Sequence, residues 1–164
     1  MTGGRRVWVI RWIGLALILA AAPGVPANAL VVPQELAGLR LAHSQQGAEA
    51  RAEIERLHGK SIPISDGYVA HYGNQSPAAM LYVSQAQDEK VAQRQVEQMT
   101  ARIRAGNGPF THLRESTRFG MTVFSTLGEG QVHYYFRRGA VVVWVAADPT
   151  IAQQALADAV SKLR

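Results

Sequence analysis

The strongest constraint on the fold is the alternation of side chains in residues 131–146, QVHYYFRRGAVVVWVA. Side chains along a β-strand point alternately to opposite faces, so this pattern predicts a β-hairpin. We place its two-residue turn at Arg138-Gly139, because glycine readily adopts the positive φ that such turns require. One face of the predicted hairpin is almost wholly apolar and is expected to lie under helices: Val132, Tyr134, Phe136, Val141, Val143 and Val145.

The opposite face of the hairpin carries polar and aromatic side chains. With this turn, His133 lies directly across from Trp144, and an earlier hairpin is expected to place His71 across from Tyr82. Rings with polar groups among them suit a ligand or partner surface. The candidate residues are His71, Tyr82, His133, Tyr135, Arg137 and Trp144. Two alternatives stay open: an ordinary solvent-exposed face, or a second core covered by an N-terminal helix.

An internal repeat contains both hairpins. A shift of 62 positions places His71 on His133 and Tyr82 on Trp144, and a shift of 60 then aligns a D-x-x-[VI]-A-Q pattern that begins at Asp88 and Asp148. We interpret the repeat as a duplicated β-hairpin–helix unit, covering about residues 67–105 and 119–163. The two copies are expected to be related by a pseudo-twofold axis.

Apolar spacing and capping residues predict three helices. The first covers residues 48–58 and ends at Gly59, the second follows the N-cap Asp88, and the third starts at Asp148-Pro149 and runs to about Lys162. Other strands are expected at 39–43, 60–65, 67–72, 78–84, 111–115 and 119–126. This order predicts an α+β two-layer sandwich, in which an antiparallel sheet is packed on one face by the two later helices, with an extra N-terminal helix.

Residues 1–29 have the composition of a signal peptide. Three arginines precede an apolar run of 11 residues, Trp12–Ala22, and Ala27-Asn28-Ala29 supplies the small-x-small pattern of a cleavage site. The run is shorter than the roughly 20 residues of a spanning helix. We therefore expect cleavage after Ala29 and a soluble, secreted or periplasmic protein with one domain, residues 30–164. An uncleaved membrane anchor is the alternative, and the choice between Sec and twin-arginine export stays open.

The basic excess of the chain is largely a property of this N-terminal segment. Three of the 17 lysines and arginines lie there and none of the 12 acidic residues, so the net charge falls from +5 to +2 without it. A nucleic-acid partner is therefore not expected. With no cysteine, the chain has no thiol nucleophile and no thiolate ligand for zinc or an iron–sulfur cluster.

The sequence indicates no metal, no cofactor and no catalytic residue. The five histidines lack the short local spacing of zinc modules: His43, His58, His71, His112 and His133. Only His71 and His133 have a reason to converge, through the repeat. The chain also lacks the G-x-S-x-G pattern of a serine hydrolase and the G-x-x-x-x-G-K-[ST] pattern of a phosphate-binding loop.

These observations predict a non-enzymatic binding or interaction module of the bacterial cell envelope, which uses the polar and aromatic sheet face. Its partner is an unknown small molecule or envelope protein, and no membrane span is expected after cleavage. One alternative is a small enzyme in which His133 and Glu129 act as acid and base. Another is a homo-oligomer that buries the same face against a second copy.

Overall fold

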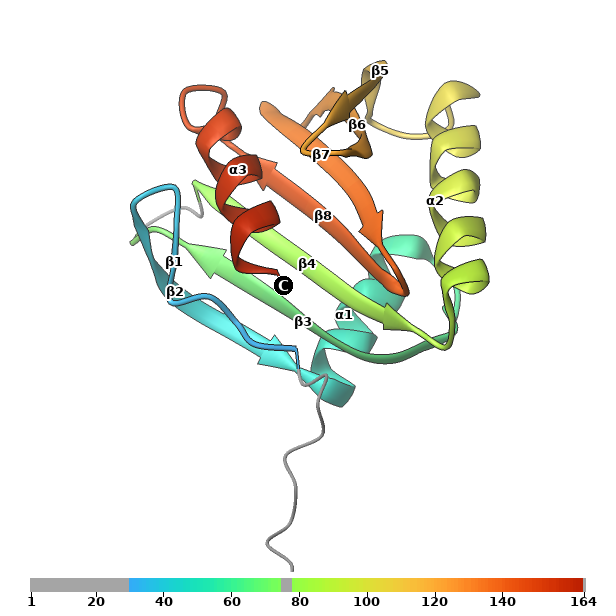
Figure 1. The fold of residues 1–164 in the computed structure, drawn as a ribbon, viewed down its shortest axis with the longest axis horizontal. Helices are drawn as coiled ribbons and strands as arrows, with labels where there is room; N and C mark the ends of the chain where they lie inside the picture. Colours follow the sequence, from blue (N-terminus) through green and yellow to red (C-terminus); the bar gives the residue numbers. More distant parts are fainter. Residues whose placement is uncertain (1–29, 75–77, 164) are drawn as a thin grey trace, which may run out of the picture.

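The computed structural model describes residues 30–74 and 78–163 (Figure 1). Within them, eight strands form one open antiparallel sheet in the order β1-β2-β3-β4-β8-β7-β6-β5. The strands are β1 (Glu35–Leu36), β2 (Leu39–Gln46), β3 (Ile64–Tyr72), β4 (Ala79–Ala86), β5 (Thr111–Arg118), β6 (Met121–Gly128), β7 (Gln131–Arg138) and β8 (Val141–Ala147). The helices are α1 (Gly47–His58), α2 (Glu89–Arg104) and α3 (Ala152–Lys162). The predicted signal peptide and residues 75–77 of the first hairpin loop lie outside the described residues.

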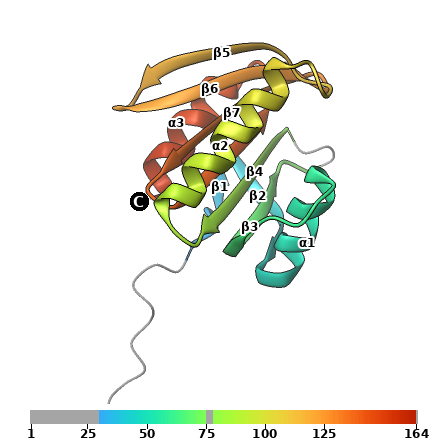
Figure 2. The same cartoon turned by 90° about the vertical axis from the view of Figure 1, so that its right-hand side faces the viewer.

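The predicted two-layer sandwich is wrong, because helices cover both faces of the sheet. Figure 2 shows α3 and α1 on opposite sides of the strands. On the side of α3, Leu156 packs with Val143 and Val145 in the main core. On the other side, α2 packs over Tyr135 and α1 packs over Val69. The second face also carries many apolar side chains, and burying them under helices is favourable because it removes apolar surface from water.

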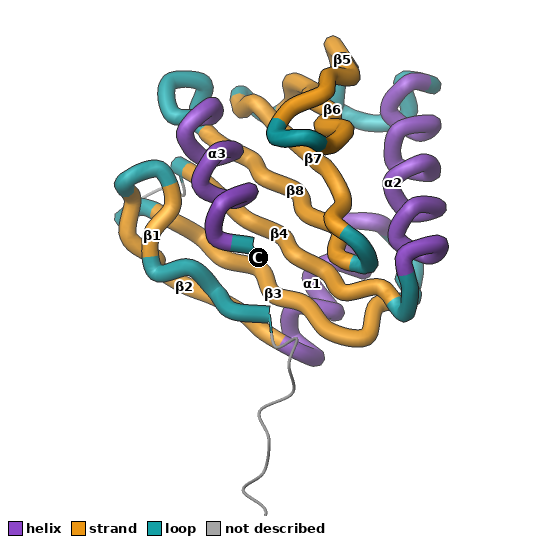
Figure 3. The backbone as a smooth tube through the Cα atoms, in the orientation of Figure 1, coloured by secondary structure: helices purple, strands orange, loops and turns teal. Residues whose placement is uncertain are grey.

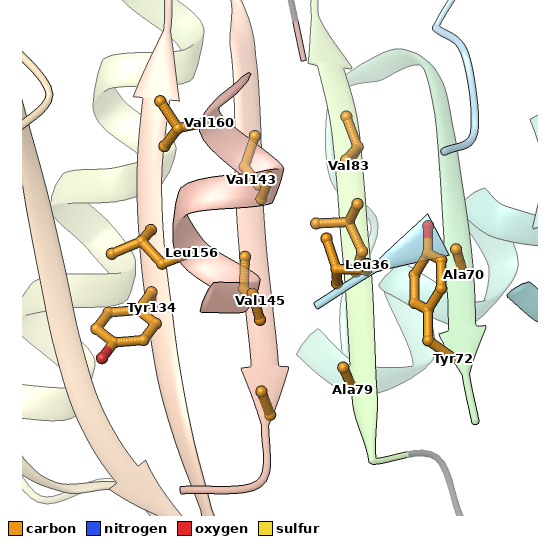
Figure 4. Packing of buried hydrophobic residues seen from close by; sticks show 14 of the residues in the cluster. Leu36, Ala70, Tyr72, Ala79, Val83, Tyr134, Val143, Val145, Leu156 and Val160 are labelled. Carbon is orange, nitrogen blue, oxygen red and sulfur yellow. The ribbon is translucent and has the colours of Figure 1, made fainter. Parts of the chain in front are cut away.

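The main core lies between the sheet and α3, with β1 folded across it. Leu36 of β1, Tyr72 of β3 and Leu156 of α3 are fully buried there (Figure 4). The Tyr72 hydroxyl donates to the Pro33 carbonyl over 2.9 Å, which fixes the segment that leads into β1. The face predicted as apolar in the second hairpin is confirmed as part of this core.

The helix boundaries follow the predicted caps, with one exception. Asp88 caps α2 by accepting a hydrogen bond from the Val91 amide over 2.8 Å, and α1 ends at Gly59 with φ of 65°. The third helix begins at Ala152, later than predicted, because Asp148–Ile151 forms a separate turn closed by the Ile151 amide on the Asp148 carbonyl. None of the helices in the described ranges is long and apolar enough to cross a membrane.

The predicted register of both hairpins is wrong by two residues. The second turn is Gly139-Ala140, since Arg138 pairs with Val141, and Trp144 therefore lies opposite Tyr135 rather than His133. In the first hairpin, His71 lies opposite Met80 rather than Tyr82. A slip of two residues preserves the faces, because side chains alternate with a period of two. The predicted faces therefore hold while the cross-strand partners change.

The repeat relates the strands but not the helices. Tyr82 and Trp144, which the 62-residue shift aligns, are direct neighbours across β4 and β8 at the centre of the sheet. However, α2 and α3 lie on opposite faces, so a single twofold axis cannot relate two complete hairpin–helix units. The predicted symmetric arrangement is wrong in this respect, and the duplication of the sequence itself stays a prediction.

Candidate functional site

The sheet face under α1 and α2 carries a row of aromatic side chains across four strands. Phe124 of β6 stacks on Tyr135 of β7 with ring centroids 4.9 Å apart, and Tyr135 stacks on Trp144 of β8 at 5.1 Å. Tyr82 of β4 is the next residue in the row, directly opposite Trp144. The row exists because antiparallel pairing places these positions opposite one another on the same face.

Helix α2 makes the middle of this row a second core. Tyr135 is fully buried, with Val96 of α2 in the same cluster. The Thr100 hydroxyl donates to the Val96 carbonyl over 2.8 Å, so the Tyr135 hydroxyl, 2.9 Å from Thr100 Oγ1, is the donor in that pair. Burial raises the pKa of Tyr135. This tyrosine is therefore held as a structural element rather than presented to solvent.

Phe110, from the loop between α2 and β5, closes one end of the second core. Its ring packs edge-on against His133, with centroids 4.9 Å apart, and against Trp144 at 5.2 Å. Gly128 lies beneath the ring, and a Cβ at this position would come within 2.5 Å of Phe110. Sequence reasoning missed Phe110 and Gly128, because their association depends on the path of a loop.

His133 is a buried and fully hydrogen-bonded histidine. Its Nε2 lies 2.9 Å from the Gly128 carbonyl, and the Trp144 indole N–H lies 3.1 Å from its Nδ1. The indole can only donate, so Nδ1 accepts and the proton is on Nε2. Burial lowers the pKa of His133, while the bond to Gly128 and the nearby Glu129 carboxylate oppose that shift. Because both ring nitrogens are occupied, the geometry does not support an acid–base role for His133 with Glu129.

The stability of the protein is expected to depend on the protonation of His133. Its folded-state pKa lies below the ordinary value of 6.5, so its contribution is complete above pH 6.5 and is lost as the pH falls below that value. Urea unfolding between about pH 8 and pH 5 should show falling stability, with a shallower fall for His133→Gln. An unchanged pH dependence in the variant would show that His133 is not responsible.

The remaining predicted residues lie around this core rather than in it. The half-buried Tyr82 packs with Ile54 under α1, and burial raises its pKa to about 12. Arg137 is partly exposed and forms an ion pair of 2.7 Å with Glu89 at the start of α2. His133, Tyr135 and Trp144 thus come together, with Tyr82 at their border and Arg137 near the surface.

His71 and His133 share a face and a row but do not converge. The row runs from His71 through Met80 and Ala146 to His133, so three strand spacings separate the two histidines, about 14 Å. In the described ranges, no three His, Asp or Glu side chains are placed to hold a metal ion together. Their use as a ligand or partner surface, together with the other four residues, stays a prediction.

The most accessible part of the sheet is its β5 edge, which sequence reasoning did not select. Six of the eight side chains of β5 are exposed, on both faces of the strand. The opposite edge is the two-residue β1, and the Ala37 amide in the turn that follows it donates to the Asp158 carboxylate of α3 over 2.9 Å. The polar and charged composition of THLRESTR was the available sequence signal for a solvated strand.

Two shallow hollows among the described residues are lined by none of the six predicted residues, although Glu89 of the first is the ion-pair partner of Arg137. One, of about 470 Å³, adjoins the start of α2 near Asp88, and the other, of about 450 Å³, adjoins residues 31–35 and Lys162. Both are wide open to solvent. No family model, curated protein or solved structure matches this chain. Its function therefore has to be argued from its own residues.

Proposed function

We propose that this chain is an exported, non-enzymatic interaction module of the bacterial cell envelope, and that a partner protein adds an extended segment to the free edge of β5. The observation that carries the proposal is the accessibility of β5, which pairs with β6 on one side and with no other strand of residues 30–74 and 78–163 on the other. An edge strand presents alternate N–H and C=O groups to a further strand. Strand addition of this kind is a common mode of peptide recognition.

The regular part of β5 is suited to a partner strand. Residues 114–118 pair without interruption with β6, and the irregularity of β5 is confined to its start, where His112 has φ of 56°. Four of these five side chains are exposed, the exception being the half-buried Arg118. An added segment would therefore meet a regularly paired strand whose side chains are mostly exposed.

The charges of β5 favour an acidic partner over a second copy of the chain. Arg114 and Arg118 lie on the same face as α3, where Arg118 donates to Gln153 over 2.8 Å. If two copies paired antiparallel about Ser116, Arg114 of each would lie opposite Arg118 of the other, and like charges in such positions repel. A segment with acidic residues at alternate positions would instead pair with both arginines.

Export is supported by the composition of residues 1–29 and by the position of the first packed residues. Leu30 and Val32 already pack against the main core, so packed residues are present from the first position after the expected cleavage site. The N-terminal residue of the exported protein tests this part of the proposal. A start far from Leu30 would contradict the expected cleavage.

The partner site can be tested with two synthetic peptides of opposite charge, one alternating glutamate with valine and one alternating lysine with valine. In ¹⁵N-labelled protein, the acidic peptide is expected to shift the amide resonances of β5 and β6, and the basic peptide is expected to leave them unchanged. The double variant Arg114→Glu, Arg118→Glu should abolish the effect. The control, Lys90→Glu with Arg94→Glu on the exposed side of α2, changes the net charge equally and should retain it.

Three results would contradict the β5 site. Equal shifts with both peptides, or loss of binding in the α2 control, would indicate only a general effect of charge. Shifts centred on Tyr82 and Trp144 would instead place the partner on the sheet face predicted from the sequence.

A further inference from the structure

Three side chains with metal-binding atoms lie side by side on β2, β3 and β4. His43 pairs directly with His71, and His71 pairs directly with Met80, so the three form one row on one face of the sheet. The two imidazole rings meet edge to face, with centroids 6.0 Å apart. The row lies on the side of α1, outside the second core and away from β5.

The spacing of the two histidines is close to that of a shared metal ion. Metal–nitrogen bonds of about 2.0–2.1 Å place the centroids of two imidazoles on one ion about 5 Å apart. The observed 6.0 Å can therefore be closed by small rotations about the side-chain bonds. Met80 can approach the same point, because the Cβ atoms of directly opposed residues lie only about 4.5–5.5 Å apart.

The surroundings leave these donor atoms available. His43 is exposed, and His71 and Met80 are partly exposed. The Tyr82 hydroxyl, two residues along β4, donates to Met80 Sδ over 3.9 Å, and the second lone pair of the thioether is left for a ligand. Glu53 of α1 is near enough to affect the pKa of His71, but its carboxylate is paired with Arg56 at 2.7 Å.

The donor set selects the metal. Imidazole nitrogen suits copper, nickel and zinc, whereas a thioether is a soft donor that favours Cu(I). We propose that His43, His71 and Met80 form a binding site for one copper ion, with the strongest preference for Cu(I). Sequence reasoning considered only His71 with His133; the strand order brings His43 to His71 instead and adds a sulfur donor.

The test is a titration of the purified full chain with Cu(I) under anaerobic conditions, in competition with a chromophoric Cu(I) chelator. One equivalent is expected to bind. His43→Gln and His71→Gln should each weaken binding at least about tenfold. Met80→Leu, which keeps the side-chain volume, should weaken Cu(I) binding by about tenfold but change Ni²⁺ binding by less than about twofold. X-ray absorption of the copper complex should show a sulfur neighbour that is lost in Met80→Leu.

Matched controls separate this site from adventitious binding. His112→Gln and Met121→Leu remove the same chemical groups on β5 and β6, and both variants should bind Cu(I) like the wild type. The double variant Arg114→Glu, Arg118→Glu, which reverses two charges on β5, should also bind Cu(I) like the wild type. Near-ultraviolet circular dichroism checks that each variant is folded. The proposal would be overturned by the absence of one-to-one binding, by equal weakening in the controls, or by retention of the sulfur neighbour in Met80→Leu.

Discussion

Replacing Tyr135 with alanine is expected to lower the free energy of unfolding by about 3–5 kcal/mol, the cost of removing a large aromatic side chain from a core. Tyr135 is fully buried, its ring lies between those of Phe124 and Trp144, and its hydroxyl is bonded to Thr100 under α2. An exposed residue on a binding surface would cost far less. The size of the loss, measured by urea unfolding, therefore reports whether this face is a core.

Two further variants define the source of the loss. Tyr135→Phe removes only the hydroxyl and should cost about 1 kcal/mol, because Thr100 keeps its bond to Val96. Arg137→Ala, on the same strand and face, breaks a partly exposed ion pair and should cost no more than about 1 kcal/mol. If Tyr135→Ala cost no more than Arg137→Ala, the second core would not exist as described.

The change Gly67→Ala is expected to destabilise the protein by about 1–3 kcal/mol, although it adds a single methyl group. A Cβ at Gly67 would lie 2.7 Å from the Val83 carbonyl oxygen and 3.7 Å from Ile54 Cδ1 of α1. The carbonyl belongs to the adjacent strand β4 and cannot rotate away as a side chain would. The hairpin backbone must shift, and α1 must move with it.

Hydrogen exchange adds a spatial readout to this prediction. In Gly67→Ala, the amides of α1 should lose protection more than those of α3, because α3 packs on the other face of the sheet. The control Gly130→Ala has open space around the new methyl group and should cost about 1 kcal/mol, from its positive φ alone. Equal losses of protection in α1 and α3 would show that the methyl group at position 67 does not displace α1 in particular.

Periodicity predicted the faces of the strands but not the covering of the sheet. The alternation in residues 131–146 correctly separated Tyr134 and Phe136 from His133 and Tyr135. Likewise, the apolar stripe of α2, which includes Ala92 and Val96, is confirmed as its buried side. A stripe shows that one side of a helix is buried, but it does not show against which face of a sheet. With apolar residues on both faces, α2 and α3 could not be assigned from sequence.

The candidate sites depended on information that local patterns do not contain. His71 and His133 were placed on one face by the repeat, and the structure agrees, but β4 and β8 lie between them. The neighbour of His71 is His43, which precedes it by a whole helix and loop. Strand order fixes such pairs, and no spacing along the chain reports it. The charges of β5 were visible in the sequence, whereas its position at the edge was not.

The sheet consists of two meanders, β1–β4 and β5–β8, which meet only where β4 pairs with β8 (Figure 3). In the second meander, two-residue turns join each strand to the next, so those pairings are local in sequence. The pairing of Tyr82 with Trp144, by contrast, joins residues 62 positions apart. Because α2 and three further strands lie between β4 and β8 along the chain, the inner edge of β4 has no strand partner until β8 has been synthesised. The centre of the sheet therefore depends on the one pairing among the described strands that does not join neighbours in sequence, and such a non-local pairing is expected to form slowly because the long intervening loop must first be closed.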